Sequence, residues 1–329
     1  MEPSAMQAPY VSVIVPAFNA ARHIERALDS VAAQSEARHE VLVCDDASSD
    51  DTARIDTDRM ALDPRIRLVR LDSNGGASAA RNRGLALASG RWIAILDADD
   101  AFHPERLERL TALGESLGAD IVADNLVMVE SGSGRALRTA MPTGTGAAPR
   151  RLQAEQLVDK SLFLRREFKL GYLKPIFRRS FLEAARIVYH EDLRIAEDYH
   201  LYLDCLLAGA DFRVSEDPLY LYTLTAGSLS RSLARADLEQ LALRSARSLE
   251  HPAVAASPAL EASLRRRHQS ILDNIRFMDI VALAKTRRIG AAIRLATLPR
   301  PMLRPIVTQG SEAIWKRVRR LAPRHGGAA

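Results

Sequence analysis

Acidic residues gather directly after two apolar, β-branched runs of the sequence. They are Asp45 and Asp46, after residues 40–44, and Asp97, Asp99 and Asp100, after residues 91–96. Three carboxylates within four positions repel one another, and a bound cation commonly offsets that repulsion. Carboxylate oxygens suit Mg²⁺ or Mn²⁺, which usually leave coordination positions open for substrate phosphates. The second group therefore predicts a divalent-metal site that handles a phosphorylated ligand.

The pair Asp45-Asp46 has two interpretations. A carboxylate at this place can accept hydrogen bonds from the base or the ribose of a nucleotide. The same two residues can instead form a solvated turn that caps the helix after them. The local sequence is compatible with both.

The elements that must position these acids alternate between strand and helix from about residue 10 to residue 129. The expected strands are residues 11–15, 40–44, 66–71, 91–96 and 121–129; one expected helix follows Asn19 as its N-cap, one spans 77–88 and one begins at Pro104. This alternation predicts an α/β fold, a mostly parallel sheet with helices on both faces. Ligands of such sheets bind outside the carboxyl ends of the strands, so both acidic groups should meet at one edge.

The pattern changes beyond residue 130. Residues 131–149 are rich in Gly, Ser, Thr and Pro, which predicts a mobile loop or a boundary between two halves. A helix is expected at residues 196–208, and the chain after Arg235 has a helical pattern as far as Pro299. The expected parts are a tail (1–9), a first half (10–130), a second half (131–234) and a helical C-terminal region (235–329).

Four segments, in this order and spacing, resemble the inverting glycosyltransferases of family 2, whose fold is called GT-A. They are VSVIVPAFNA (11–20), VLVCDDASSDDT (41–52), NGGASAARNRGLALASG (74–90) and RWIAILDADD (91–100). Each segment alone is a weak signal, but together they span about 90 residues. The resemblance implies a nucleotide-sugar-binding first half and an acceptor-binding second half, with a divalent metal, Mg²⁺ or Mn²⁺.

The resemblance also implies roles for single residues of the first half. Pro16, Ala17, Phe18 and Asn19 would line the nucleotide pocket; Asp45 or Asp46 would bind the base, commonly uracil; Asn74, Arg81 and Asn82 would hold the nucleotide; and Asp97 would face the ribose or donor sugar. Asp99 would bind the metal, with Asp100 beside it in support. Neutralising the diphosphate in this way stabilises the leaving group as the glycosidic bond breaks.

An inverting transfer also needs a base next to the acceptor hydroxyl. Glu197 and Asp198 in IAEDYHLY (195–202) resemble the family's ED motif, which implies that Asp198 is the base. The alternative is a pair of first-turn acids that complement the helix dipole. The pair Glu191-Asp192 is a second candidate for the base.

Two further segments resemble parts of the family around the acceptor site. They are GYLKPIFRRSF (171–181), which contains Lys174, and YLYTLTAGSLSR (220–231), in which Ser228 and Arg231 could close on the diphosphate. The Q-x-x-R-W motif of processive polysaccharide synthases is missing, which favours transfer of a single sugar.

The C-terminal region is strongly basic. Residues 285–329 carry 11 Lys and Arg against one acid, a local charge of +10, whereas the whole chain has +5. Its basic residues alternate with aliphatic ones, and Trp315 precedes two further basic pairs. This pattern predicts a helix in the headgroup region of an anionic membrane surface, and it does not favour a nucleic-acid partner. A helical lid packed on the catalytic domain is the alternative.

The resemblance is to bacterial enzymes that build exopolysaccharide repeat units, which implies a UDP-sugar donor and a lipid-linked acceptor. No apolar run approaches the ~20 residues that span a bilayer, and the first residues lack the basic start and apolar core of a signal peptide. We therefore expect a cytoplasmic protein, peripheral on the inner face of the cytoplasmic membrane. The alternative function is a non-catalytic component of a polysaccharide assembly complex that binds nucleotide or membrane.

Overall fold

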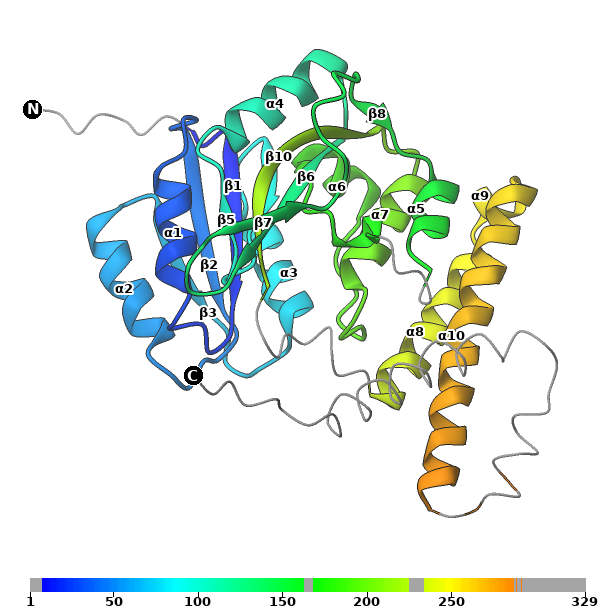
Figure 1. Ribbon diagram of the computed structural model, residues 1–329. Helices are drawn as coiled ribbons and strands as arrows, with labels where there is room; N and C mark the ends of the chain where they lie inside the picture. The colour runs from blue at the N-terminus through cyan, green and yellow to red at the C-terminus, as the bar shows by residue number, and fades with distance from the viewer. Residues whose placement is uncertain (1–7, 163–167, 225–233, 287, 289–290, 292–329) are drawn as a thin grey trace, which may run out of the picture.

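The computed structural model describes residues 8–162, 168–224, 234–286, 288 and 291. Its centre is a ten-stranded sheet with the order β3-β2-β1-β4-β9-β6-β10-β5, in which β7 also pairs with β6 and β8 with β10 (Figure 1). The strands are β1 (Val11–Ala17), β2 (His39–Asp45), β3 (Ile66–Arg70), β4 (Trp92–Ile95), β5 (Ala101–Phe102), β6 (Ile121–Glu130), β7 (Ala136–Thr139), β8 (Arg150–Arg151), β9 (Ile176–Arg178) and β10 (Phe212–Leu224).

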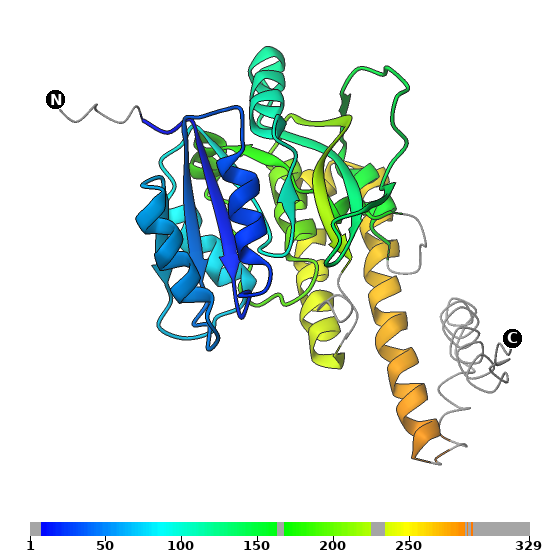
Figure 2. The same cartoon turned by 60° about the vertical axis from the view of Figure 1, so that its left-hand side comes forward.

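Helices cover both faces of this sheet (Figures 1 and 2). They are α1 (Ile24–Ala32), α2 (Thr52–Leu62), α3 (Ala77–Leu87), α4 (Arg106–Leu117), α5 (Ala154–Lys160), the 3₁₀ turn η1 (Leu170–Tyr172), α6 (Arg179–Ala185), α7 (Glu197–Leu207), α8 (Arg235–Leu249), α9 (Pro252–Ala255) and α10 (Pro258–Lys285). The predicted α/β architecture is confirmed, and the expected helix at 196–208 is found within one residue at each end.

The first four strands in the sheet are parallel, as expected. β2 pairs with β1 and β3, and β1 pairs with β4, in one direction. The short strand β9 then pairs antiparallel with both β4 and β6, and β10 runs parallel to β6. The carboxyl ends of β1, β2 and β4 therefore lie side by side, so the loops that follow them can build one site.

Burial on both faces explains why these runs form central strands. Side chains of a strand point alternately to opposite faces. Ile14 of β1 packs with Leu42 in one core, whereas Val13 and Val15 pack with Val41 in the other. Helices α3, α5 and α7 contribute to the first core, and α1 and α4 to the second. The central strands β1 and β4 are thus buried along almost their whole length, as strands covered on both faces require.

Two predicted helix starts are wrong. Asn19 does not cap α1, because α1 begins at Ile24 and four residues lie between Asn19 and Ile24. The backbone of Asn19 has a φ of 50°. The third expected helix begins at Arg106 and not at Pro104, which lies in the turn before it.

The segment 131–149 contains β7, and this strand extends the same sheet by pairing with β6.

The helices α8 and α10 form a separate layer against α5 and α7, at the end of the sheet away from α2 (Figure 1). A small core of Leu193, Leu238, Leu241, Ala242 and Ile271 joins them to the segment before α7. The predicted helical character after residue 235 is confirmed as far as Lys285. Within the described part of the chain, no helix combines the length and apolarity needed to cross a membrane. Most of the basic region lies outside the described residues.

Candidate active site

The loops after β1 and β2 are tied to each other. The backbone N–H of Asn19 donates to Ser48 Oγ at 2.9 Å, and Asn19 Oδ1 accepts from the Ser49 N–H at 2.9 Å. Pro16 and Ala17 form the last two residues of β1, and Phe18 beyond them is 51% exposed. An exposed aromatic ring at a strand end can stack on a planar base.

Asp46 connects the end of β2 to the start of α3. Its carboxylate accepts from the N–H groups of Gly75 and Gly76 at 2.7 and 2.8 Å, and Asn74 Nδ2 donates to its carbonyl at 3.3 Å. A Cβ on Gly75 would lie 2.8 Å from Ala79 Cβ, so the turn needs glycine there. Asp46 therefore neutralises the N-terminus of α3, and not that of α2, the helix that directly follows it.

Asp45 is fully buried beside this turn. Its Oδ1 accepts from the Ser48 N–H at 3.0 Å, and its Oδ2 lies 3.3 Å from Arg70 Nε. The two acids after β2 thus both stabilise local backbone, but they do not form a solvated turn that caps the following helix. Both are buried, and the first N–H of α2, that of Thr52, donates to Asp50 Oδ1 at 3.0 Å. The binding of a nucleotide base by Asp45 or Asp46 stays a prediction.

The three acids after β4 differ in their partners. Asp97 accepts from Arg81 Nη2 at 2.8 Å and lies 2.7 Å from Lys174 Nζ. Burial alone would raise the pKa of Asp97, but Lys174 and Arg81 hold it well below its usual range. Asp97 is therefore an ionised carboxylate whose two oxygens already have cationic partners.

Asp100 is held by β10. Tyr220 Oη donates to its Oδ2 at 2.8 Å, and the Thr223 N–H donates to its Oδ1 at 2.7 Å. Burial, together with the charges of Asp97 and Asp99, raises the pKa of Asp100 well above its usual value. Asp100 thus anchors the loop to the sheet, and the sequence pattern had no signal for its partner Tyr220.

Asp99 is the remaining carboxylate of the group, and it makes no ion pair with any side chain in the described ranges. Burial and the nearby charge of Asp97 raise its pKa, so a cation here would remove an unfavourable interaction. The described residues contain no cluster of three His, Cys, Asp or Glu that could hold a metal. The site fits an ion such as Mg²⁺ that takes one or two carboxylates and completes its shell with phosphate oxygens and water.

The first turn of α7 brings the predicted base to the same place. Glu197 Oε1 accepts from Arg81 Nη1 at 3.0 Å, and Asp198 Oδ2 lies 2.7 Å from Lys174 Nζ. Arg81 also lies 4.0 Å from Asp198 Oδ1. Arg81 and Lys174, both buried, therefore join Asp97 of the first half to Glu197 and Asp198 of the second.

Asn82 lies apart from this network. Its Nδ2 donates to the Tyr189 carbonyl at 2.9 Å and to Glu191 Oε1 at 2.8 Å, and its Oδ1 accepts from the Tyr189 N–H at 2.8 Å. The side chain thus fastens α3 to the segment before α7. Glu191, of the second candidate pair, is exposed and shares no contact with Arg81 or Lys174 among the described interactions.

Tyr189 is a neighbour that sequence reasoning missed. Its ring lies 5.2 Å from the Arg81 guanidinium, a cation–π contact that adds to the burial of that side chain. Two other expected residues, Ser228 and Arg231, fall outside the described residues.

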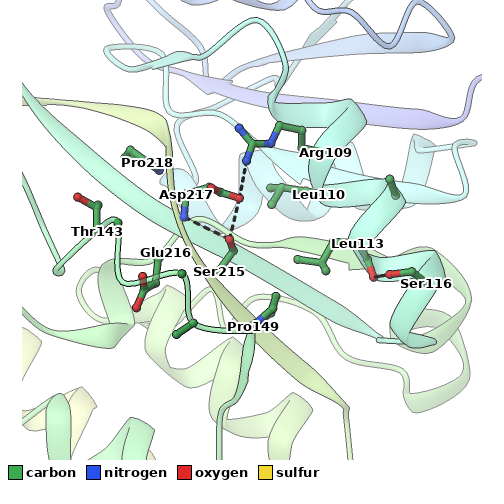
Figure 3. Close-up of a pocket in the computed structure, with 14 residues that line it drawn as sticks. Arg109, Leu110, Leu113, Ser116, Thr143, Pro149, Ser215, Glu216, Asp217 and Pro218 are labelled. Atoms are coloured by element: carbon green, nitrogen blue, oxygen red, sulfur yellow. Dashed lines mark hydrogen bonds and ion pairs between the residues drawn. The ribbon is translucent and has the colours of Figure 1, made fainter.

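A separate cavity of about 670 Å³ lies between α4, residues 143–149 and β10 (Figure 3). Its wall includes Leu113, Thr143 and Pro149, and at its edge Arg109 pairs with Asp217 at 2.7 Å. None of the candidate residues lines it. The chemistry is therefore concentrated at the strand ends and not in this cavity.

Comparison with known proteins identifies the family. The model of the family "Glycosyl transferase family 2" matches residues 12–181, more than half of the chain. The succinoglycan biosynthesis protein ExoO of Rhizobium meliloti (strain 1021) is 35% identical over 325 residues, which cover 98% of this chain and 90% of the relative. The Escherichia coli enzyme UDP-Glc:alpha-D-GlcNAc-diphosphoundecaprenol beta-1,3-glucosyltransferase WfgD is 31% identical over 196 residues, 60% of this chain and 69% of that protein.

A solved structure supports the same fold. S. aureus TarS in complex with UDP-GlcNAc superposes with a TM-score of 0.68 and 23% sequence identity, covering 90% of this chain and 85% of that one. At this identity the likeness concerns the fold alone, and it confirms the GT-A type expected from the resemblance. The chain belongs to glycosyl transferase family 2 and is a glycosyltransferase.

Proposed function

We propose that this glycosyltransferase moves a single sugar, with inversion, from a UDP-sugar to a hydroxyl of a lipid-linked acceptor in exopolysaccharide or cell-surface glycan synthesis. The observation that carries the proposal is the close approach of Asp97 and Asp198. Both carboxylates lie 2.7 Å from the same ammonium group, Lys174 Nζ. A donor-facing group after β4 and a base at the start of α7 thus share one site, as a direct displacement requires.

In the proposed reaction Asp198 accepts the proton of the acceptor hydroxyl. The hydroxyl oxygen forms a bond to the anomeric carbon, and the bond from that carbon to the diphosphate oxygen breaks, so that UDP leaves with the electron pair. Asp97 faces the ribose or donor sugar. Asp99 would hold Mg²⁺ or Mn²⁺. When bound, such a cation would neutralise the negative charge of the diphosphate.

Residues 10–130 are assigned to the donor and residues 131–234 to the acceptor, with residues 1–9 as a tail and 235–329 as a helical basic region. The donor pocket is assigned to Pro16, Ala17, Phe18, Asn19, Asp45, Asp46, Asn74, Arg81, Asn82 and Asp97. This assignment of the donor pocket is supported by the parallel pairing of β1 with β2 and β4, because the loops that follow these strands then lie at one edge of the sheet. Asp46, Asn74 and Asn82 would act mainly by holding the loops around the nucleotide, given their backbone contacts.

The relatives support the substrate classes. ExoO carries succinoglycan biosynthesis in its name, and WfgD is named for a UDP-Glc donor and a diphosphoundecaprenol-linked acceptor. A lipid-linked acceptor explains why the enzyme would need a membrane-facing basic region. We therefore assign the protein to the inner face of the cytoplasmic membrane, bound peripherally through residues 285–329.

Vesicle flotation tests the membrane assignment. The full chain should float with vesicles that contain anionic lipid, detach at high salt, and ignore neutral vesicles, because each basic residue near the surface contributes about 1 kcal/mol. A chain truncated after Ala284 should remain in solution and still release UDP from its donor. Equal flotation of the two chains would place the contact elsewhere, and no flotation of either would reject it.

A panel of nucleotide sugars tests the proposed chemistry. The full chain, supplied with Mn²⁺, should release UDP from at least one UDP-sugar, slowly with water as acceptor and faster with an undecaprenyl-diphosphate-linked sugar. Anomeric analysis of the product by NMR should show inversion at the transferred sugar. Binding of UDP without any release would instead support the non-catalytic component of an assembly complex.

A further inference from the structure

Lys174 occupies an unusual place for a lysine. Its side chain is buried, and its Nζ contacts Asp97 Oδ2 and Asp198 Oδ2 at the same distance of 2.7 Å. Burial lowers the pKa of Lys174, but the attraction of Asp198 and Asp97 outweighs this effect and raises that pKa well above its usual value. The ammonium is therefore charged and bridges the donor-facing and acceptor-facing carboxylates.

The backbone around Lys174 is fixed from two directions. The Leu173 carbonyl accepts from Tyr202 Oη of α7 at 2.5 Å, and the Lys174 carbonyl accepts from Arg106 of α4. Arg106 is itself fully buried in a two-pronged ion pair with Asp124, at 2.9 and 2.8 Å. Because its own backbone is held on both sides, Lys174 is preorganised and does not simply follow the carboxylates.

Asp198, by contrast, has few other constraints. Its Oδ1 has no hydrogen-bond partner in the described part of the chain, and Arg81 lies 4.0 Å away from it. Asp97 keeps Arg81 as a second partner at 2.8 Å. Loss of the ammonium would thus free the Asp198 carboxylate to rotate, while Asp97 would stay in place.

We propose that Lys174 is the positioning residue of this glycosyltransferase: it fixes the base Asp198 relative to Asp97, and hence the acceptor relative to the donor. One oxygen of Asp198, Oδ2, is held by the ammonium, whereas the other, Oδ1, is buried and has no hydrogen-bond partner among the described residues, which leaves it as the oxygen that an incoming acceptor hydroxyl would have to reach. The inference rests on the proposed role of Asp198. A misplacement of about 1 Å can lower a rate by about 10²-fold, so loss of the contact between Lys174 and Asp198 should lower turnover measurably.

A merely structural lysine would behave differently. If Lys174 only neutralised buried charge, its removal would weaken folding and donor binding whether or not Asp198 were present. A positioning lysine acts through Asp198, so its removal should have little further effect on turnover once that base is gone. A double-mutant cycle separates these cases.

The experiment measures UDP release from UDP-glucose, UDP-GlcNAc and UDP-galactose with Mn²⁺, and UDP affinity by calorimetry. The full-length proteins are wild type, Lys174→Met, Asp198→Asn and the double variant, with Lys160→Met, an exposed lysine on α5, as the matched control. Lys174→Met should lower kcat by about 10²-fold when Asp198 is present, but by less than about twofold in the Asp198→Asn background. The Kd for UDP should change by less than about threefold, and Lys160→Met should match wild type.

The outcomes test the role of Lys174 and the proposed function separately. Equal losses in both backgrounds, or a loss of UDP affinity as large as the loss of rate, would overturn the role of Lys174 and leave the proposed function intact. No UDP release by wild type from any of the three donors would overturn the proposed function, and this inference with it. If Lys174→Met does not fold, Lys174→Arg serves in the same cycle, because a guanidinium keeps the charge but cannot reproduce the contact geometry.

Discussion

Arg81 Nη1 donates to Glu197 Oε1 at 3.0 Å, across 116 positions of the chain. The same guanidinium holds Asp97 through its other terminal nitrogen at 2.8 Å. A single buried side chain on α3 therefore joins the loop after β4 to the first turn of α7. The planar guanidinium suits this bridge, because it can direct hydrogen bonds to two carboxylates at once.

Replacing Arg81 by Met should destabilise the fold, because Asp97 and Glu197 would lose a partner in a poorly solvated place. We expect a loss of about 2–3 kcal/mol in the free energy of unfolding, at the lower end for broken buried pairs since both acids keep some solvent contact. Urea denaturation measures it, with Arg83→Met, an exposed neighbour on α3, as the control. Equal stability of the two variants would show that the bridge contributes nothing to folding.

Asp99→Asn should lower turnover by about 10²-fold or more and leave the melting temperature near that of wild type. The reason is that Asp99 is the one acid after β4 whose carboxylate has neither a protein cation nor a Tyr donor among its described contacts; Arg26 donates only to its backbone carbonyl. EDTA should inactivate wild type, and Mn²⁺ or Mg²⁺ should restore it. The control Asp159→Asn, on α5, should keep full activity. Undiminished UDP release in chelator would reject the metal assignment.

Asp56 on α2 gives the protein a pH-dependent stability. It is fully buried, neither carboxylate oxygen has a hydrogen-bond partner in the described chain, and burial with the charges of Asp45 and Asp50 raises its pKa to about 7. Between the ordinary value of 3.8 and this raised pKa, the folded state binds a proton that the unfolded state has lost. The free energy of unfolding therefore falls as pH rises through this window.

Asp56→Asn should remove that dependence. The variant should exceed wild type in stability by a margin that grows from about pH 4 to about pH 7 and then levels off, on the order of 2–4 kcal/mol. Urea unfolding at pH 5 and pH 8 measures it. Asp58→Asn, on the exposed face of the same helix, is the control and should show no such trend. A margin that stays constant with pH would mean that Asp56 is ionised throughout.

The strand ends could be predicted because their signal is local. Apolar β-branched runs such as residues 11–15 and 40–44 mark buried strands, and the acids that follow them must then lie at the sheet edge. The start of α1 could not be predicted as well. Asn19 has the type of an N-cap residue, but contacts with Ser48 and Ser49, some 30 positions away, keep its backbone in a left-handed turn.

Long-range partners account for most of what the sequence did not reveal. The three-residue strand β9 is too short to carry a pattern, yet it sits between β4 and β6 and places Lys174 just before it at the site. Nothing near Asp46 indicates that its carboxylate will meet the amides of Gly75 and Gly76. The sequence predicted one cation for all three acids after β4. In the structure Arg81 and Lys174 contact Asp97, and Tyr220 donates to Asp100. Among the described contacts, therefore, only the carboxylate of Asp99 lacks such a partner and is left for a cation to bind.

The central claim is that Asp198 is the base of a glycosyl transfer. Its most direct test compares UDP release by wild type, Asp198→Asn and Glu191→Gln, with UDP affinity measured on the same proteins. Asp198→Asn should lose about 10²–10⁴-fold in turnover while its Kd for UDP stays near that of wild type, and Glu191→Gln should remain active. An active Asp198→Asn with an inactive Glu191→Gln would contradict the account and assign the base to the other carboxylate.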